Sequence, residues 1–452
     1  MSESAERLAA LGPDSDTTHL RRTLGFRDLL LYGLAYVCPC APFQILGFVW
    51  QKSNGLIALA YILGGVCMYF TAKSYAVMTE AVPNAGSVYG FARHALGPFA
   101  GFVAGWMILL DYLLIPGYMY DVIAVALETL VPRVDRAVWI VLVGVLTLGV
   151  NWFGLKVTAR VNMFAVFSQL AYIAVLLVFS VLALHAGKGN GALTLKPVFS
   201  PQLFNTHALF AATSICVMSF LGFDAVSTLA EEVKGNDRRL VGRAIVGVLI
   251  LSAALFALVA WVLGNLLSGL TIKDAAAASY ELAAWSIGPW ASISLAWATA
   301  TIIGFTNVLP MQVGVARILF AMGRDRQLPQ AMARVHPRYG TPYIGMLVAS
   351  AITLAVALIL RFHVDEAASL VNFGALSGFL LLHVSVLARF GVRARSGQRF
   401  SHVAVPLLGA AVVLAVMTGM SSLATTLGLA WLGAGLVYGA VLHRSRRDAL
   451  PV

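Results

Sequence analysis

Acidic and small polar residues interrupt a segment that is otherwise apolar enough to lie inside a membrane. The segment MSFLGFDAVSTLAEE covers residues 218–232 and follows an apolar run. If the helix resumes after Gly222, four polar side chains recur at helical spacing and share one face: Asp224, Ser227, Thr228 and Glu231. An ionised carboxylate that faced lipid would cost at least a few kcal/mol. We therefore expect this face to line a polar cavity, where Asp224 could bind a cation or carry a proton.

Asp224 also has a purely structural interpretation, in which its carboxylate caps a helix or pairs with a neighbouring helix. Acids within membrane segments usually mark a substrate or ion path, which favours the functional interpretation. Glu231 and Glu232 lie beside the basic residues Lys234 and Arg238, where solvated salt bridges are expected. Glu231 remains a candidate for proton transfer.

A second acid lies in the apolar segment that contains LLDYLLIP. Asp111 lies about 13 residues into this segment, and the helical rise of about 1.5 Å per residue places it near the middle of a membrane. Tyr112 shares a face with Ile115 and Met119, so it either lines a cavity or packs as an ordinary aromatic residue. In a later apolar segment, Thr306 and Asn307 are candidate partners for an ion or for the backbone.

The first apolar segment, LLLYGLAYVCPCAPFQILGF, contains two prolines. Because proline removes a backbone donor and clashes with the preceding turn, Pro39 and Pro42 predict an interruption over residues 37–42. A simple proline kink would explain only one of them. Broken membrane helices are tolerated where the freed backbone lines a cavity or is buried in protein. The two interruptions supply the candidate binding residues: Tyr36, Val37, Cys38, Pro39 and Cys40 at the first, and Ser219, Phe220, Gly222, Phe223 and Asp224 at the second.

Membrane-spanning helices must position these residues. Hydrophobic residues make up 60% of the chain and charged residues 11%, and the mean hydropathy is +0.84, which excludes a soluble domain. The predicted fold class is an all-α membrane protein with twelve transmembrane helices. The expected spans are 29–51, 56–79, 98–130, 137–155, 162–186, 207–231, 242–267, 289–316, 341–360, 366–388, 403–422 and 425–442. Residues 80–98, rich in proline and small residues, are expected to form a helix-breaking connector.

The two interrupted spans start five helices apart. Interrupted helices at matching places in two halves are typical of transporters that bind substrate at an inverted-repeat interface. The predicted organisation is a tail (1–28), a first five-helix repeat (29–186), a second (207–388), two appended helices (403–442) and a second tail (443–452). No residue-level repeat joins the halves, so this prediction depends on hydropathy and on the positions of the breaks.

The net charge of +11 is distributed unevenly about the predicted spans. Most of the 31 Lys and Arg residues fall on the side that holds the N-terminus. The other side has Lys52, Arg133, Arg136, Lys188, Lys196, Lys273 and Arg361. This asymmetry predicts that both termini are cytoplasmic, and it explains the basic charge without a nucleic-acid partner. The first 28 residues have no apolar signal segment or cleavage site, so the first span is expected to be retained.

Cysteine and histidine patterns indicate neither a metal site nor an enzyme. Cys38, Cys40, Cys67 and Cys216 all fall within predicted spans, so we predict no disulfide, no metal and no cofactor. His383 is expected to be packed and hydrogen-bonded rather than a proton relay. No Ser/His/Asp set, HExxH or P-loop occurs, which argues against an enzyme. A channel or a receptor would need a continuous pore or a sensor domain, and neither the loops nor the tails provide one.

Four segments together resemble the amino acid–polyamine–organocation superfamily over residues 25–443: PNAGSVY, GFDAVSTLAEE, RILFAMGRDRQLP followed by GTP, and LVNFGALSGF. Within it, LLDYLLIP, MSFLGFDAVSTLAEE and GLAY before a proline are most similar to bacterial putrescine importers. The resemblance implies a LeuT-like 5+5 inverted repeat with broken helices 1 and 6 and substrate bound at the breaks, commonly with proton coupling. It also implies that Tyr112 and the nearby acids contact an amine.

The sequence departs from the superfamily at two positions. Amino acid permeases usually have a Gly-Ser-Gly type turn in helix 1, where this chain has Cys38, Pro39 and Cys40. A helix 5 Lys of several proton-coupled members corresponds here to Gln169, so the proton carrier is not assigned by resemblance. Coupling candidates are Asp224, Asp111, Glu231, Gln169 and Thr306.

The first departure predicts the charge of the substrate. Free N–H groups at a helix break hold a substrate carboxylate, and a break with proline and side chains offers fewer of them. Acids beside such a break suit an ammonium group instead. We expect an importer of a small cationic amine such as putrescine, coupled to protons rather than sodium, in a bacterial inner membrane. The alternative is a permease for neutral or cationic amino acids on the same fold.

Overall fold

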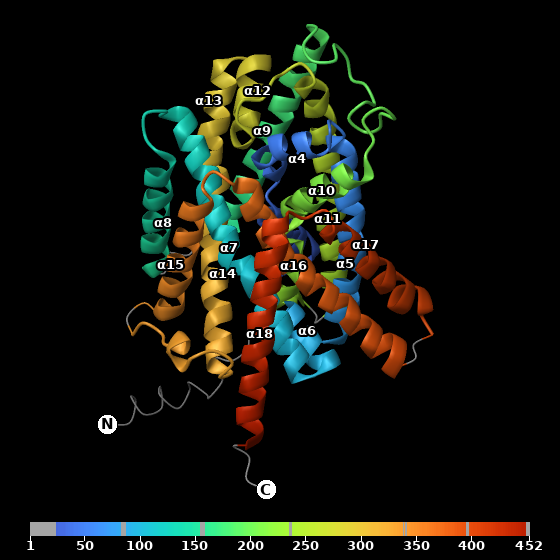
Figure 1. Cartoon of the computed structure of the whole chain (residues 1–452), viewed down its shortest axis with the longest axis vertical. Coiled ribbons are helices and arrows are strands. Elements are labelled where there is room, and N and C mark those ends of the chain that lie inside the picture. Colours follow the sequence, from blue (N-terminus) through green and yellow to red (C-terminus); the bar gives the residue numbers. More distant parts are fainter. Residues whose placement is uncertain are drawn as a thin grey trace, which may run out of the picture.

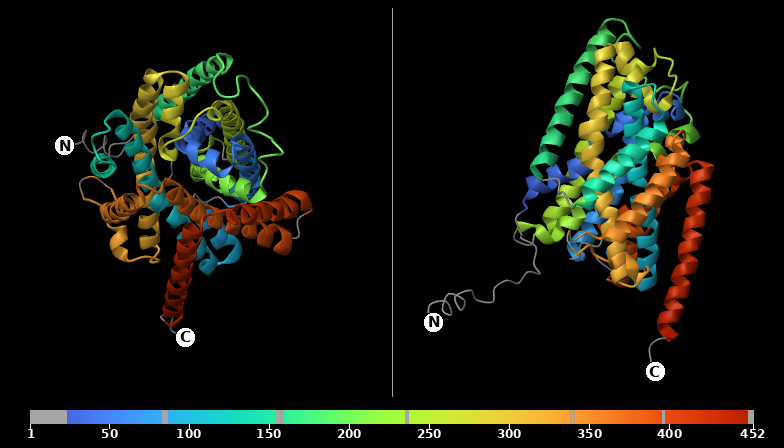
Figure 2. Two further views of the ribbon diagram at one scale, coloured as in Figure 1. Left: turned by 45° about the horizontal axis from the view of Figure 1, so that its top comes forward. Right: turned by 90° about the vertical axis from the view of Figure 1, so that its left-hand side faces the viewer.

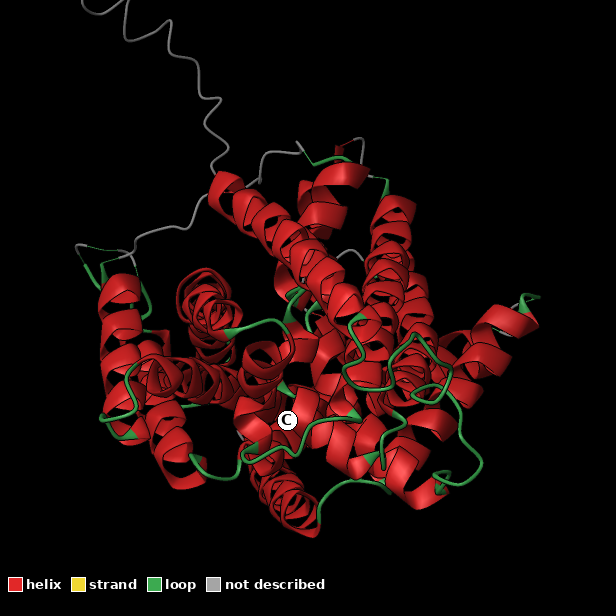
Figure 3. Ribbon diagram, turned by 90° about the horizontal axis from the view of Figure 1, so that it is seen from above, coloured by secondary structure: helices red, strands yellow, loops and turns green. Residues whose placement is uncertain are grey.

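The computed structural model describes residues 24–82, 87–153, 159–234, 237–337, 339, 341–394 and 397–448. In this part of the chain, helices dominate and the β-structure is an isolated bridge between Leu24 and Val233. Figure 3 accordingly shows helices joined by loops. Figure 1 places α12 and α13 at one end of the bundle and α6 at the other, and we call these the α12 end and the α6 end.

The helices follow in chain order. The first half contains α2 (Phe26–Val37), α3 (Ala41–Gln44), α4 (Leu46–Lys52), α5 (Ile57–Ala81), α6 (Ser87–Leu96), α7 (Pro98–Leu130), α8 (Arg136–Trp152) and α9 (Ala159–His185). The remainder contains α10 (Thr206–Cys216), the 3₁₀ helices η1 (Val217–Phe220) and η2 (Phe223–Glu232), α11 (Arg238–Leu267), the 3₁₀ turn η4 (Ala275–Ala277), α12 (Ala278–Ser286) and α13 (Pro289–Ala298). It ends with the π-helix η5 (Thr299–Ile303), α14 (Gly304–Arg324), the 3₁₀ helix η6 (Gln330–Ala333), α15 (Tyr343–Leu360), α16 (Val364–Val386), the π-helices η7 (Leu387–Arg393) and η8 (Phe400–Ala404), α17 (Val405–Met417) and α18 (Ser422–Asp448).

Ten helices in the described residues are long and apolar enough to cross a membrane, and the bent pair Phe26–Gln44 and Leu46–Lys52 is an eleventh candidate. Arg136–Trp152 is a shorter apolar helix. The chain is therefore a multi-pass membrane protein, and the exact number of twelve spans stays a prediction. Large apolar side chains on the outside are consistent with a lipid environment; on α9, for example, Phe164 is 69% exposed and Phe167 is 55% exposed.

The centre of the bundle is formed by α7 and its neighbours (Figure 1). Gly374 of α16 packs directly on α7, because a Cβ at Gly374 would lie 2.7 Å from the backbone nitrogen of Asp111. A small residue is therefore required where α16 approaches α7. The match between the predicted span 98–130 and α7 is complete.

Two helices lie where the sequence predicted a connector or no element. Residues 87–96 form α6, whose apolar residues Val88, Phe91, Ala92 and Ala95 recur at helical spacing and are buried. The expectation of a non-helical connector over 80–98 was therefore wrong for this part. A second short helix, α12, precedes α13 at the α12 end.

The last helix lies on the outside of the bundle, as Figure 2 shows. Trp106 of α7 and Trp431 of α18 stack with ring centroids 4.5 Å apart. Each indole N–H donates to the other residue's carbonyl oxygen at 2.9 Å. This reciprocal contact fixes α18 against the central helix.

Candidate functional site

The first predicted interruption is present. Helix α2 ends at Val37, Cys38 has a φ of +61°, and α3 begins at Ala41. Pro42 lies in the first turn of α3, where a missing N–H leaves no hydrogen bond unmade. The axis then bends by 61° between the Phe26–Gln44 segment and α4. The two prolines thus end one helix and start another within the same span.

The backbone donors of this interruption are already used inside the protein. The N–H of Cys38 donates to Leu34, that of Ala41 to Cys38, and that of Phe43 to Cys40. The N–H of Cys40 donates to the side-chain oxygen of Gln169 at 3.4 Å. Pro39 and Pro42 have no N–H. Residues 38–43 therefore present no unbonded N–H group to a substrate carboxylate.

Gln169 of α9 reaches the break from outside both interrupted helices. Its Oε1 accepts from the Cys40 amide and also lies 3.5 Å from the Cys38 thiol. The Gln169 side chain is 3% exposed, so water does not compete for these contacts. Gln169 acts here as a hydrogen-bond acceptor for the break.

The second interruption lies at Leu221 and Gly222. Leu221 has an extended ψ of 141°, and Gly222 has a φ of +108°. A Cβ on Gly222 would lie 2.8 Å from the carbonyl oxygen of Tyr36 and 3.2 Å from the nitrogen of Val37. The two interruptions therefore touch through their backbones, and glycine is required both for the dihedral angle and for the contact.

The helix that follows Gly222 is 3₁₀ rather than α-helical. With three residues per turn, Asp224 aligns with Ser227 and Ala230 instead of Glu231. The α-helical spacing on which the polar face was predicted is therefore replaced by 3₁₀ spacing, which keeps Asp224 and Ser227 in line. The side chains of Thr228, Glu231 and Thr306 lie outside the described residues, so those candidates stay predictions.

Asp224 is buried at the start of η2, and its side chain has partners. Tyr75 of α5 donates its hydroxyl to Asp224 Oδ2 at 3.2 Å. Asp224 follows the N-cap Gly222 and lies in the first turn of η2, where a negative charge is favourable. Its carboxylate is therefore paired with the neighbouring helix α5 through Tyr75, at the junction of the two interruptions.

Asp111 belongs to the same region. Its carboxylate interacts electrostatically with that of Asp224, and Tyr112 interacts with both acids and with Tyr36. Asp111 Oδ1 is buried and has no hydrogen-bond partner among the described residues. We call Asp111, Tyr112, Asp224, Tyr75 and Tyr36 the acid–tyrosine cluster. Of its two acids, Asp111 is the one with an oxygen that is free to bind a cation.

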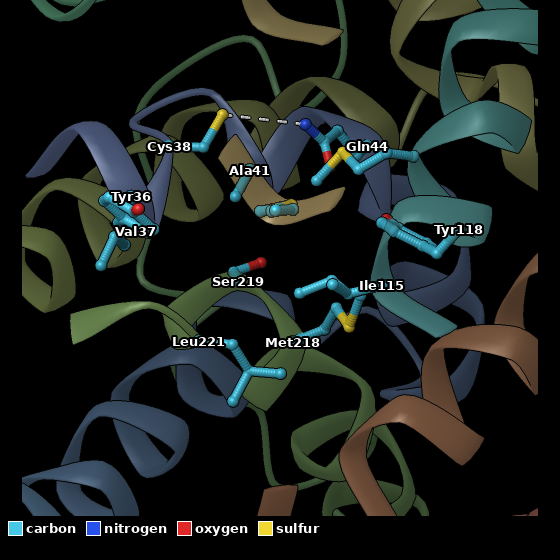
Figure 4. Close-up of a pocket in the computed structure, with 12 residues that line it drawn as sticks. Tyr36, Val37, Cys38, Ala41, Gln44, Ile115, Tyr118, Met218, Ser219 and Leu221 are labelled. Carbon is cyan, nitrogen blue, oxygen red and sulfur yellow. Dashed lines mark hydrogen bonds between the residues drawn. The ribbon is translucent and has the colours of Figure 1, made fainter. Parts of the chain in front are cut away.

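A small cavity of about 20 Å³, roughly the space that a water molecule needs, lies next to this cluster (Figure 4). Four predicted binding residues line it: Tyr36, Val37, Cys38 and Ser219. Eight further residues complete the lining: Ala41, Gln44, Ile115, Tyr118, Met119, Met218, Leu221 and Met311. Ile115 and Met119 could have been predicted as lining residues, because the sequence places them on the same helical face as Tyr112. No sequence pattern points to Gln44 or Met311. The lining is mainly aliphatic and thioether, which suits an alkyl chain.

The other predicted binding residues lie outside the lining: Pro39, Cys40, Asp111, Tyr112, Phe220, Gly222, Phe223 and Asp224. Phe220 packs against Phe256 with ring centroids 5.2 Å apart, and Phe223 packs against Tyr75 at 5.9 Å. These two aromatic residues position the second interruption rather than face the cavity.

Polar groups at the cavity wall are few. Ser219 Oγ lies 3.2 Å from the Tyr61 hydroxyl, and Gln44 donates to the Cys38 sulfur at 3.8 Å. The Tyr36 hydroxyl accepts from Tyr32 at 3.2 Å. The cavity is thus an apolar chamber with hydroxyl groups on its wall and the acid–tyrosine cluster beside it.

Comparison with known proteins agrees with this arrangement. The amino acid permease family profile matches residues 28–439. The low-affinity putrescine importer of Escherichia coli is 30% identical over 447 residues, which cover 97% of each chain. The branched-chain amino acid permease of Bacillus subtilis is 28% identical over 454 residues, covering 92% of each chain. Cationic amino acid transporter 4 of Mus musculus is 26% identical over 85% of this chain and 62% of its own length.

Both the family profile and these relatives describe permeases and not enzymes. The profile spans the two interruptions, the acid–tyrosine cluster and the cavity between α2, α7 and the second break. The chain belongs to the amino acid permease family of the amino acid–polyamine–organocation superfamily.

Proposed function

We propose that this protein is a secondary active transporter that imports a small cationic amine of the putrescine type. Two features together support the proposal: the backbone amides of the first interruption are already hydrogen-bonded, and two acids lie nearby. The first interruption has no unbonded N–H for a carboxylate. Asp111 and Asp224, which influence each other electrostatically, each lie one turn from a residue that lines the cavity. Such a site favours ammonium over carboxylate because only positive charge compensates the buried acids.

The aliphatic wall of the cavity supports the same substrate class. Ile115, Met119 and Leu221 offer apolar contacts for a methylene chain. A putrescine importer is also among the relatives that align over nearly the whole chain. The substrate would lie in the cavity with one ammonium group directed toward the acid–tyrosine cluster.

For coupling, we propose that protons rather than sodium drive uptake. Asp111 and Asp224 are two carboxylates in electrostatic contact inside the bundle, so binding one proton or one ammonium relieves their repulsion. Gln169, Glu231 and Thr306 are secondary candidates. Alternating access would come from movement between two five-helix repeats, 29–186 and 207–388, about the paired breaks.

We further propose that the α6 end faces the cytoplasm of a bacterial inner membrane. Arg93 of α6 forms an ion pair with Asp325, which follows α14, so the basic end of α14 lies at this end. The start of α11 packs against the end of α5 next to α6, which brings Arg239 to the same side, the side expected to be basic. Both termini would then be cytoplasmic.

Uptake of radiolabelled putrescine into proteoliposomes tests the proposal. We expect accumulation that a protonophore abolishes and that sodium replacement leaves intact. Asp111→Asn and Asp224→Asn should each reduce putrescine uptake at least tenfold. Asp365→Asn is the matched control, because Asp365 forms only a partly exposed ion pair with Lys52 at 4.0 Å. Strong leucine uptake without putrescine uptake would overturn the proposal.

An amino acid permease is the second candidate, because a branched-chain amino acid permease and a cationic amino acid transporter are also relatives. The apolar cavity would suit a branched side chain. Asp224→Asn separates the two functions, since it should abolish diamine uptake and spare neutral amino acids.

A further inference from the structure

One buried acid on α7 has no part in the function described so far. Asp121 lies ten residues beyond Asp111, or about 15 Å farther toward the α12 end at the helical rise. Asp121 is 0% exposed, and neither carboxylate oxygen has a hydrogen-bond partner among the described residues. A buried carboxylate without hydrogen bonds costs free energy when it is ionised. We therefore expect a proton or another cation that is not part of the protein to bind it.

The two arginines that influence Asp121 electrostatically bind other groups. Asp121 interacts electrostatically with Arg136 and Arg361. However, Arg136 Nε bonds Glu128 at 2.7 Å, its Nη2 bonds Asp274 at 3.2 Å, and its Nη1 donates to the Arg361 carbonyl at 2.9 Å. All three guanidinium nitrogens therefore have partners. Arg361 Nη1 donates to Leu358, while its Nε is buried without a partner and makes no ion pair with Asp121.

These groups leave one negative charge in excess. Three acids (Asp121, Glu128 and Asp274) face two arginines (Arg136 and Arg361), and within the described part of the chain Asp121 is the acid without a hydrogen-bond or ion-pair partner. Three further elements that pack on α7, namely α13, η5 and α16, supply no free positive charge. Neither α13 nor η5 has a titratable residue. On α16, Asp365 pairs with Lys52, Glu366 accepts from Ser421, and His383 bonds Thr71 and Ser74.

Asp121 lies one turn beyond Tyr118, which lines the cavity. Figure 4 shows Tyr118 at the α7 side of the cavity. Asp111 lies one turn before Ile115, another lining residue of α7. The two acids therefore precede and follow the lining residues of α7 along a single helix.

We propose that Asp121 is a cation site at the α12 end of the chamber, which takes one positive charge, either a proton or a substrate ammonium, during transport. The inference rests on the proposed amine importer and adds a second acid to its path. Glu128 and Asp274 bind the guanidinium of Arg136, so that this guanidinium does not form an ion pair with Asp121.

Asp121→Asn in proteoliposomes tests the site and distinguishes its two sources of charge. If an ammonium binds there, the variant should lose at least tenfold in putrescine affinity, and both counterflow and proton-driven uptake should fall. If a proton binds there, affinity and counterflow should remain, while proton-driven accumulation and its pH dependence should be lost. Asp121→Glu should restore either property in part. Parental behaviour of Asp121→Asn in all three assays would overturn the proposal.

Thermal unfolding without substrate gives an independent readout. Because Asp121 has no partner, Asp121→Asn should unfold at the parental temperature or above it, whereas Glu128→Gln should unfold below it. A variant Asp121→Asn that unfolds early or fails to fold would show a structural partner and would overturn the site. If the parent imports leucine and not putrescine, the proposed amine function is wrong. Proton binding at Asp121 is then tested separately, by whether Asp121→Asn reduces proton-driven leucine uptake.

Discussion

Gly222 lies with its α-carbon against the carbonyl group of Tyr36, so the two interrupted helices meet backbone to backbone. An alanine at this position would place Cβ 2.8 Å from the Tyr36 oxygen, at a φ of +108°. The left-handed conformation alone costs a non-glycine residue about 1–2 kcal/mol. The contact therefore has no tolerance for a larger residue.

The first prediction follows from this contact. Gly222→Ala should separate the two interruptions and reduce transport at least tenfold in proteoliposomes that contain equal amounts of protein. Gly149→Ala on α8 is the control, because a Cβ there has nothing within 4 Å and should leave uptake unchanged. Parental uptake by Gly222→Ala would show that the breaks do not need this approach.

The hydrogen bond between Tyr75 and Asp224 gives the second prediction. Tyr75→Phe removes the 3.2 Å hydrogen bond and leaves the carboxylate with fewer donors. A hydrogen bond to a charged group contributes about 1.5–3 kcal/mol, which corresponds to about a tenfold to hundredfold change in transport efficiency. Uptake kinetics measure it. Tyr69→Phe, on the same helix and 37% exposed, should behave like the parent; equal effects of both variants would contradict the role of Tyr75.

Gln169 provides the third prediction. Gln169→Leu leaves the buried Cys40 N–H without its acceptor, which costs about 1–3 kcal/mol. The unfolding temperature of the purified protein in detergent should therefore fall. The same exchange at the exposed Gln202 should not change it. An unchanged unfolding temperature for Gln169→Leu would mean that the amide finds another acceptor.

His383 gives the fourth prediction, which separates packing from proton transfer. The ring lies 2.9 Å from Ser74 Oγ and 3.3 Å from Thr71 Oγ1, and the residue is 0% exposed. His383→Leu should lower thermal stability by about 1–3 kcal/mol because two hydroxyl groups lose their partner. The pH profile of uptake should keep its shape. A normal stability with an altered pH profile would instead identify His383 as a proton carrier, and His363→Leu at an exposed position is the control.

The sequence was informative where a local chemical constraint decides the backbone. Pro39 and Pro42 end and restart a helix through their missing donors, so the first interruption could be placed within a few residues. Gly222 next to Asp224 placed the second. The hydropathy of residues 98–130 set both ends of α7. The packing of His383 was also predicted correctly from its apolar surroundings.

Contacts between distant segments were not predictable. Gln169 and Cys40 are separated by 129 residues, and nothing near either residue indicates that they meet. The 3₁₀ conformation after Gly222 was missed because polar spacing alone does not distinguish three residues per turn from 3.6. Nothing in the sequence distinguishes Asp121 from an ordinary acid in a helix. Its role depends on two structural facts, the missing partners of its carboxylate oxygens and the binding of Arg136 to other acids.

The bonded amide of Cys40 shows that a helix outside the two interruptions controls which donors the first break offers. Under the proposed amine function, α9 would therefore set part of the charge preference of the site while both breaks keep their shape.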